Sequence, residues 1–299
     1  MSQPFFSVIV PTYGRPGQLT TCLQALAHLH YPREHFEVVV VDDGSATPFD
    51  GVIAAFHDRL DVTLLRQSHA GPAAARNTGA AHAKGQIFAF TDDDCKPAFD
   101  WLQTLQLRFA IAPNQIVGGR TCNALPANPY STASQIIIDM VYGYYNADPS
   151  RARFFASNNL ALPANHFHTI GGFDPTFTTS EDRELCDRWL HHGYGMTYAP
   201  EVIVYHAHAL TLRTFWWQHF NYGRGAFRFH RIRARRGSGR FRQELKFYMR
   251  LPSLLGRSLS QEQGMRRLLL PALLLVWQGA NTAGFLWEKM SQAKLMESC

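Results

Sequence analysis

Three adjacent carboxylates, Asp92, Asp93 and Asp94, follow an apolar run at 86–91. Adjacent carboxylates repel one another unless a cation neutralises them, and hard divalent cations prefer oxygen ligands of this kind. In an extended segment Asp92 and Asp94 would point to one side and Asp93 to the other. One side could hold a metal ion while the other binds a ribose. The triplet therefore indicates a metal–diphosphate site, with a solvated loop as the alternative.

Two further polar turns follow apolar runs in the same way. Residues 12–15 follow the run at 6–11, and residues 42–45 follow the run at 36–41. Ligands of parallel α/β sheets bind beyond the carboxyl ends of the strands. An ordinary loop explains any one of these turns, whereas three turns at one edge favour a binding site.

The elements that would position these turns alternate along the first 120 residues. Apolar runs typical of buried strands lie at 6–11, 36–41, 62–65, 86–91 and 115–118, and helical spacing lies at 19–26, 72–83 and 99–110. Such alternation predicts an α/β fold with a mostly parallel sheet and helices on both faces. Further on we expect a strand with a polar centre at 154–162, a helix at 181–192, and strands at 196–199 and 202–206.

A second acidic pair, Glu181 and Asp182, begins the helix expected at 181–192. Thr179 or Ser180 is expected to cap that helix. Acidic residues in a first turn complement the helix dipole, and from the residues alone this reading is favoured. The other reading is a general base that takes a proton from a hydroxyl group.

Composition excludes several classes of protein. The chain has 299 residues, 46% of them hydrophobic and 17% charged, which excludes a mainly disordered chain, a collagen-like repeat and a coiled coil. Five cysteines form no CxxC pair, which argues against a cysteine zinc site and suits a reducing compartment. The first residues lack a basic and long apolar run, so we expect no secretory signal.

Basic residues are concentrated near the C-terminus. Residues 1–223 hold 14 Lys+Arg and 19 Asp+Glu, whereas residues 224–299 hold 15 and 4. Such asymmetry indicates an anionic partner, either nucleic acid or a membrane leaflet. The tail lacks a nucleic-acid recognition motif, so no nucleic acid is expected. The uncharged stretch 268–287 just reaches the length of a membrane span, but Pro271, Gln278 and Asn281 favour an interfacial or packed helix.

At this point the sequence resembles family 2 glycosyltransferases of the glycosyltransferase-A (GT-A) fold. The matching runs, in chain order, are SVIVPTYGR (7–15), VVVVDDGS (38–45), GPAAARNTG (71–79), FTDDD (90–94), SNN (157–159), GGFD (171–174) and EDREL (181–185). The resemblance covers about residues 5–210. It implies a Rossmann-like catalytic domain over 1–210, with a nucleotide-sugar-binding half at about 1–120 and an acceptor half at 121–210. Beyond it we expect a basic helical region at 211–299 that associates with a membrane.

The resemblance also implies an activity: metal-dependent transfer of a sugar, with inversion, from a nucleotide-diphosphate sugar to a glycan or lipid-linked hydroxyl acceptor. Polysaccharide or glycolipid synthesis at the cytoplasmic, inner face of the cell membrane would follow, with an anionic membrane surface as partner. One alternative is transfer to a polyprenyl phosphate. Another is a non-catalytic protein that binds nucleic acid or a nucleotide sugar.

Family roles can be placed on matching positions. Donor binding falls to Pro11, Thr12, Tyr13, Arg15, Asp43, Arg76, Asp92 and Asp93. The ligands of a divalent cation, Mg²⁺ or Mn²⁺, would be Asp94, Asp92 and His206, with His208 as a rival of His206. Asp182 would be the base beside Glu181, and Ser157, Asn158 and Asn159 would line the acceptor or sugar pocket. Cys95 departs from the family pattern after Asp-x-Asp, which puts the surroundings of the metal in doubt.

Overall fold

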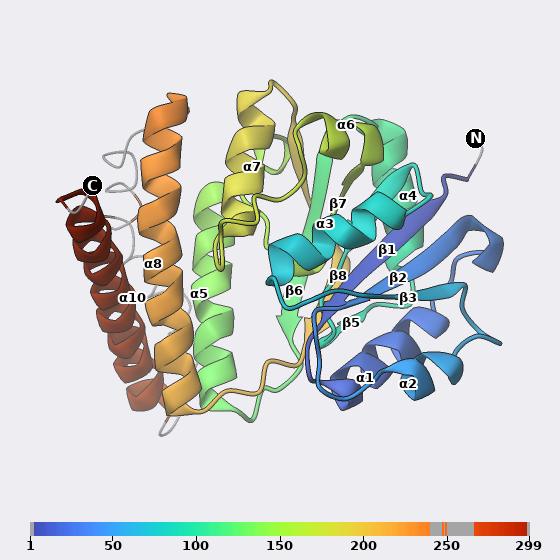
Figure 1. Ribbon diagram of the computed structural model, residues 1–299, viewed down its shortest axis with the longest axis horizontal. Coiled ribbons are helices and arrows are strands. Elements are labelled where there is room, and N and C mark those ends of the chain that lie inside the picture. The colour runs from blue at the N-terminus through green and yellow to red at the C-terminus, as the bar shows by residue number, and fades with distance from the viewer. Residues whose placement is uncertain (1–2, 240–246, 248, 250–265, 298–299) are drawn as a thin grey trace.

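The computed structural model describes residues 3–239, 247, 249 and 266–297. They form an eight-stranded sheet in the order β3-β2-β1-β4-β7-β6-β8-β5 (Figure 1). Its first half contains β1 (Phe6–Thr12), β2 (Phe36–Asp42), β3 (Val62–Arg66) and β4 (Ile87–Phe90), all parallel. Strand β2 is buried throughout, as its run of β-branched valines predicts.

The second half of the sheet is mixed. It contains β5 (Cys95–Pro97), β6 (Ile116–Asn123), β7 (Leu160–Pro163) and β8 (Met196–His206). Strand β7 runs antiparallel to β4 and β6, and β5 runs antiparallel to β8, while β6 and β8 are parallel. The expected α/β fold is confirmed, and four of the seven strand pairings are parallel.

Helices cover both faces of the sheet. One face packs against α1 (Pro16–Ala27), α2 (Asp50–Ala54) and α4 (Trp101–Ile111). The other packs against α3 (Pro72–His82), α6 (Ala164–Thr169) and α7 (Glu181–His191). Helix α3 lies very close to the sheet, since a Cβ added at Gly79 would stand 2.6 Å from Ile9 Cγ2. This close approach holds the α3 residue Arg76 at the carboxyl edge of β1.

A separate helical layer stands beside the sheet. It contains α5 (Pro129–Tyr145), α8 (Leu212–Arg236) and α10 (Arg266–Glu297), with α8 and α10 side by side (Figure 1). Their shared core includes Ile136, Phe215, Leu273 and Trp277. Helices α8 and α10 cross closely, because a Cβ at Gly284 would stand 1.8 Å from the Phe220 carbonyl oxygen. Short 3₁₀ turns lie at Arg33–His35, Pro149–Arg151 and Ser157–Asn159.

Two local expectations differ from the structure. The strand expected at 154–162 is instead a 3₁₀ turn at Ser157–Asn159 followed by β7, and the strands expected at 196–199 and 202–206 are one strand, β8. Ser180 precedes α7 as its N-cap with φ of +69°, but neither it nor Thr179 caps the helix through its side chain. The Thr179 hydroxyl donates instead to the carbonyl oxygen of Asn221 in α8.

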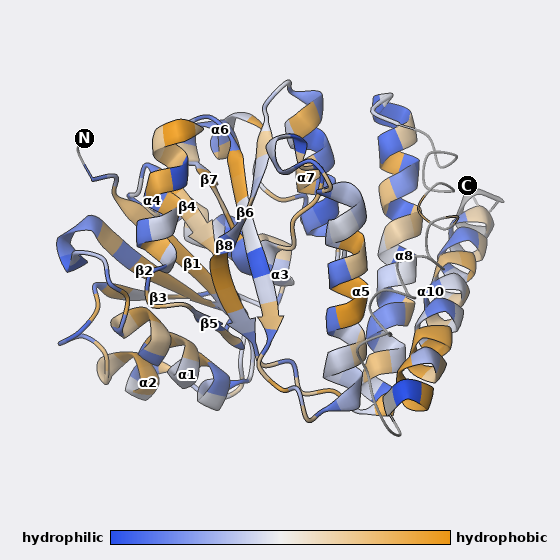
Figure 2. Cartoon of the chain, turned by 180° about the vertical axis from the view of Figure 1, so that it is seen from behind, coloured by the Kyte–Doolittle hydropathy of each residue, from blue (hydrophilic) through white to orange (hydrophobic). Residues whose placement is uncertain are grey.

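The apolar residues of α10 are concentrated in its N-terminal half (Figure 2), where they occupy two sides of the helix. One side packs inward through Leu270, Leu273 and Leu274, and the other exposes Leu268 and Leu275. By length and composition alone, Arg267–Ala293 could cross a membrane, and a third of its most apolar window is buried in the protein. Of the basic stretch 224–257, residues 240–246, 248 and 250–257 lie outside the described residues.

Candidate active site

A cavity of about 530 Å³ lies at the carboxyl edge of the parallel strands, within the range of roughly 300–1,000 Å³ that is typical of small-ligand pockets. Most of the residues expected in the site line it, from turns far apart in the sequence. These are Pro11, Thr12, Tyr13, Arg15, Asp43, Arg76, Asp92, Ser157, Asn158, Glu181, Asp182 and His206. We call it the donor cavity. The structure thus brings the turns after β1, β2 and β4 together with the start of α7.

Arg76 links two of these turns. Its Nη2 lies 2.7 Å from Asp92 Oδ1 and its Nη1 lies 2.9 Å from Glu181 Oε1. Burial opposes the charge of the guanidinium, but Asp92 and Glu181 outweigh it and raise the pKa of Arg76. Because the arginine stays charged, it offers both carboxylates a cationic partner in a site that is largely withdrawn from water.

The aspartate triplet is not extended. The amide of Cys95 donates to the Asp92 carbonyl oxygen over 3.0 Å, so the residues turn and each carboxylate meets a different partner. Asp93 is fully buried, accepts a 2.7 Å hydrogen bond from the Thr12 hydroxyl and pairs with Arg15. Burial raises the pKa of Asp93 to about 6, against the opposing effect of Arg15. Asp93 therefore holds the turn after β1 in place through Thr12 and Arg15, and it does not line the donor cavity.

Asp94 and His206 form the group best suited to a cation. One ligand atom each of Asp94, Cys95 and His206 lies within 4.8 Å of the others. His206 Nε2 lies 3.2 Å from Asp94 Oδ1. Burial opposes ionisation of Asp94, but the hydrogen bond and charge of His206 lower its pKa. Burial raises the pKa of the Cys95 thiol, which keeps it protonated and a weak ligand.

The Asp94 carboxylate fits a hard cation such as Mn²⁺ or Mg²⁺, and a His206 nitrogen beside it suits the transition metal Mn²⁺ better than Mg²⁺. Asp92 is held by Arg76 and does not belong to the group of potential ligands. His208 stacks on His206 with ring centroids 4.9 Å apart but does not line the donor cavity. Burial, and then the charge of His206, lower the pKa of His208 to about 4. The geometry therefore favours His206 over His208.

Asp182 differs from every other acid of the site. It lines the donor cavity, is half-buried, and makes no ion pair with any residue in the described ranges. Its Oδ1 accepts a 2.7 Å hydrogen bond from the Arg183 amide. Burial, and then the neighbouring charge of Glu181, raise the pKa of Asp182 to about 7. A carboxylate with such a pKa can take up a proton at neutral pH.

Asp43 organises the far side of the donor cavity. Its carboxylate accepts hydrogen bonds from the amides of Ala70 and Gly71, both over 2.9 Å, and from Gln67. His69 Nδ1 lies 3.0 Å from Asp43 Oδ2, and the His69 ring lies against Tyr13 with centroids 4.5 Å apart. These rings give a planar ligand an aromatic surface to stack on.

Asn159 has a structural position, which corrects the expectation that it lines the acceptor pocket. Its Nδ2 donates to the carbonyl oxygens of Arg120 and Val202, and its Oδ1 accepts from Trp101 Nε1 over 2.9 Å. All of its hydrogen-bonding groups are used to join strands and helix. Asn158 and Ser157 do line the donor cavity.

Two residues that line the donor cavity, His69 and Tyr222, are not among those that the sequence assigns to the site. His69 follows β3, so the rule that ligands bind beyond parallel strand ends predicts its position. Tyr222 of α8 lines the donor cavity from the helical layer. No local signal in the sequence predicts that contact, since it depends on how α8 packs.

Comparisons with known proteins agree with this architecture. The family model described as "Glycosyl transferase family 2" matches residues 7–174, and "Glycosyl transferase family group 2" matches residues 128–291. The glycosyltransferase AglE of Haloferax volcanii is 29% identical over 206 residues, which cover 68% of this chain and 67% of AglE. The pre-mycofactocin glycosyltransferase of Mycobacterium tuberculosis is 30% identical over 214 residues, covering 69% of this chain and 43% of that protein.

The validoxylamine A glucosyltransferase of Streptomyces hygroscopicus is 32% identical over 228 residues, with 66% of this chain and 54% of the relative covered. The chain thus spans about half the length of several curated relatives.

Solved structures show the same fold. The mannosyltransferase PcManGT from Pyrobaculum calidifontis, in complex with GDP-Man and Mn²⁺, matches 97% of this chain and 89% of its own at 21% identity and a TM-score of 0.69. Residues 1–349 of Staphylococcus aureus TarS match 97% and 91% at 15% identity and a TM-score of 0.61.

Proposed function

The chain belongs to glycosyl transferase family 2, and we propose that it transfers a sugar from a nucleotide-diphosphate sugar to a hydroxyl acceptor with inversion at the anomeric carbon. The observation that supports this most directly is Asp182, an acid without an ion pair among the described residues, in a cavity whose other acids lie against Arg76 or His69. A carboxylate with a pKa raised to about 7 suits a general base.

In the proposed reaction the O–H bond of the acceptor hydroxyl breaks and Asp182 takes the proton. The acceptor oxygen forms a bond to the anomeric carbon from the side opposite the leaving group. The bond between that carbon and the diphosphate oxygen breaks, and its electron pair leaves with the nucleoside diphosphate. Arg76 keeps Glu181 and Asp92 charge-balanced, so Asp182 is the acid left to accept the proton.

Donor binding would use both sides of the donor cavity. Tyr13 and His69 would stack on the nucleobase, while Asp43 holds the loop that carries His69. Asp94 and His206 would hold Mg²⁺ or Mn²⁺, and the bound cation would offset the negative charge of the leaving diphosphate.

We also propose that the helical layer attaches the protein to the inner face of an anionic membrane. Exposed apolar side chains on α8 and α10 support this, including Trp217, Leu268, Leu275 and Trp287. Exposed Arg213 lies one helical turn before Trp217, and exposed Arg267 directly precedes Leu268. Other basic residues of α8 are used internally, since Arg224 and Arg228 pair with Glu288. Fewer arginines are therefore left for a membrane than the sequence total indicates.

The test of the proposed activity is a panel of UDP-, GDP- and dTDP-sugars, titrated calorimetrically into the purified protein with Mn²⁺ and then with excess EDTA. We expect one nucleotide class to bind with Mn²⁺, to bind far less with EDTA, and to be slowly hydrolysed in the absence of acceptor. A protein that binds none of these donors with Mn²⁺ contradicts the proposed function.

A further inference from the structure

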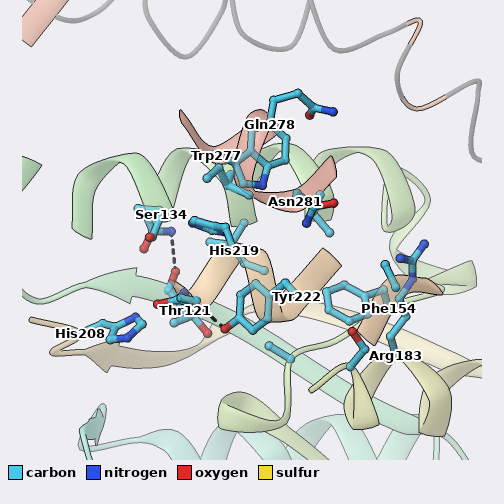
Figure 3. Close-up of a pocket in the computed structure, with 18 of the residues that line it drawn as sticks. Thr121, Ser134, Phe154, Arg183, His208, His219, Tyr222, Trp277, Gln278 and Asn281 are labelled. Carbon is cyan, nitrogen blue, oxygen red and sulfur yellow. Dashed lines mark hydrogen bonds between the residues drawn. The ribbon is translucent and has the colours of Figure 1, made fainter. Parts of the chain in front are cut away.

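A second cavity, of about 460 Å³, lies between α5, α8 and α10 (Figure 3). We call it the helical cavity. It adjoins the donor cavity, because the two share lining residues. The eight shared residues include Ile138, Phe154, Asn158, Arg183, His206 and Tyr222. A molecule in the helical cavity can therefore reach the edge of the site that contains Asp182.

The helical cavity differs chemically from the donor cavity. Its side from α5 presents Ile137 and Val141, and its side from α10 presents Trp277 and Phe285. The donor cavity instead carries Arg76, Asp92 and the pair Glu181 and Asp182. Apolar and aromatic walls of this extent gain free energy when they exclude water in favour of an apolar ligand.

One polar side chain in the helical cavity lacks a hydrogen-bond partner. His219 is only 2% exposed, and neither of its ring nitrogens has a partner within the part of the chain that the structure describes. Figure 3 shows its ring between Trp277 and Thr121, close to Tyr222. Burial lowers the pKa of His219 to about 3, so the neutral ring offers one donor and one acceptor.

A second polar side chain of the helical cavity, Ser134, also lacks a hydrogen-bond partner among the described residues. The Ser134 hydroxyl oxygen of α5 also lines the helical cavity and is buried without a partner among the described residues. Buried polar groups are nearly always hydrogen-bonded, so two unpartnered groups in one cavity indicate that a polar ligand group belongs there.

We propose that the helical cavity binds the acceptor, and that the acceptor is an amphiphile with a hydroxylated head and an apolar body. The head faces Asp182 and receives a hydrogen bond from, or donates one to, His219, while the body lies between Trp277, Phe285 and the apolar face of α5. This inference rests on the proposed function and specifies its acceptor. The apolar walls favour an apolar body over a chain that is hydroxylated throughout.

The experiment compares two probes with the same head, methyl and octyl β-D-glucopyranoside, the octyl compound below its micelle-forming concentration. Binding is measured by calorimetry and by the fluorescence of Trp277, with Trp277→Phe identifying its signal. Octyl glucoside should bind at least about tenfold more tightly than methyl glucoside, because its chain buries several methylene groups. Equal affinities for the two probes overturn the proposal.

Matched variants locate the tail and the head. Ala226→Phe fills the helical cavity from α8 and should abolish the octyl advantage, whereas Ala234→Phe, at an exposed position of the same helix, should preserve it. His219→Phe keeps the ring shape and removes both nitrogens, so it should weaken both glucosides by a similar factor of about 3–10. An undiminished octyl advantage in Ala226→Phe, or wild-type binding of both probes by His219→Phe, overturns the assignment.

Donor binding with Mn²⁺, measured on the same preparations, controls for folding and separates this inference from the proposed function. A protein that binds a nucleotide sugar but does not discriminate between the glucosides contradicts the acceptor assignment alone. Vesicles that contain a glucosyl diacylglycerol distinguish the source of the amphiphile. If these vesicles displace bound octyl glucoside, the acceptor is a membrane lipid. If the vesicles do not displace it and only free glucosides do, the acceptor is a soluble molecule.

Discussion

Arg76 Nη1 lies 2.9 Å from Glu181 Oε1, which joins the middle of α3 to the first residue of α7 across 105 positions of sequence. This contact separates the roles of two adjacent acids. Glu181 is neutralised by an arginine, whereas Asp182, one residue further on, faces the donor cavity with a raised pKa. The pairing with Arg76 thus supports Asp182 as the base.

Arg76→Ala should destabilise the protein strongly. The substitution leaves the buried Glu181 and the partly buried Asp92 without their cation, and breaking such pairs costs about 3–5 kcal/mol. Urea unfolding measures the loss. In the double variant Arg76→Met/Glu181→Met the loss should be smaller, because the buried charge opposite Arg76 is removed as well. A single variant as stable as wild type contradicts this account.

Asp182→Asn should reduce turnover by roughly 10²–10⁴, the usual contribution of a positioned acid–base group. Donor affinity should change little, and Glu181→Gln is the matched comparison. If Glu181→Gln is the crippling change and Asp182→Asn is mild, the assignment within the pair is wrong. If both are mild, a phosphate acceptor is favoured, since an ionised phosphate needs no base.

The rate should rise with pH through about 7, because only the ionised form of Asp182 accepts a proton. The pH–rate profile of wild type, with donor and acceptor saturating, measures this. The pH range from about 5.5 to about 8.5 extends about 1.5 pH units on either side of the pKa expected for Asp182. A rate that stays constant over this range would contradict Asp182 as the titrating base.

Asp182→Asn should also change how stability depends on pH. Because the pKa of Asp182 lies near 7 in the folded protein and near 3.8 ordinarily, the folded state binds the proton more tightly. Its contribution to stability is therefore complete at low pH and is lost as pH rises through about 7. The asparagine variant should be more stable than wild type at pH 8, and the difference should shrink toward pH 4. Thermal unfolding at the two pH values measures it.

Asp94→Ala should abolish Mn²⁺-dependent donor binding while the fold is retained. His206→Ala should weaken the response to Mn²⁺ more than His208→Ala, because only His206 lines the donor cavity and contacts Asp94. Calorimetric titration of Mn²⁺ with nucleotide diphosphate present measures both effects. If the wild-type protein binds the donor equally well with and without excess EDTA, the metal assignment is wrong.

The full chain should bind anionic liposomes more than neutral ones, and salt should weaken the binding. Arg213→Glu/Arg267→Glu should reduce this preference, since each exposed basic residue near an anionic surface contributes about 1 kcal/mol. Leu275→Glu should reduce binding to both liposome types through lost apolar contact. Sedimentation with the vesicles measures the bound fraction, and equal indifference to both liposome types at low salt would refute attachment.

The sheet and the donor cavity could be predicted from the sequence wherever local patterns coincide with topology. The apolar runs before Thr12, Asp42 and Asp92 predict strands, and the edge rule for parallel sheets brings their turns together. The ion pair between Arg76 and Glu181 could not be predicted, because it depends on the angle at which α3 and α7 pack.

The helical layer was the less predictable part. The sequence does carry two signals for the start of α5. Asn128 caps the helix through its side chain, and Pro129 occupies its first turn. The packing of α5 against α8 and α10 could not be predicted from the sequence. The face of α5 that lines the helical cavity is defined only by its contacts with those two helices. The position of His219 follows from those contacts alone.

The helical layer has a hydrophobic core of its own, and the two large cores under the sheet include no side chain from α8 or α10 in the described part of the chain. Substitutions within the α8–α10 pair can therefore accumulate without disturbing the turns that surround Asp43 and Asp94. If the helical cavity binds the acceptor as proposed, exchanging this pair between relatives should change the acceptor while the donor contacts change only where α8 contributes Tyr222.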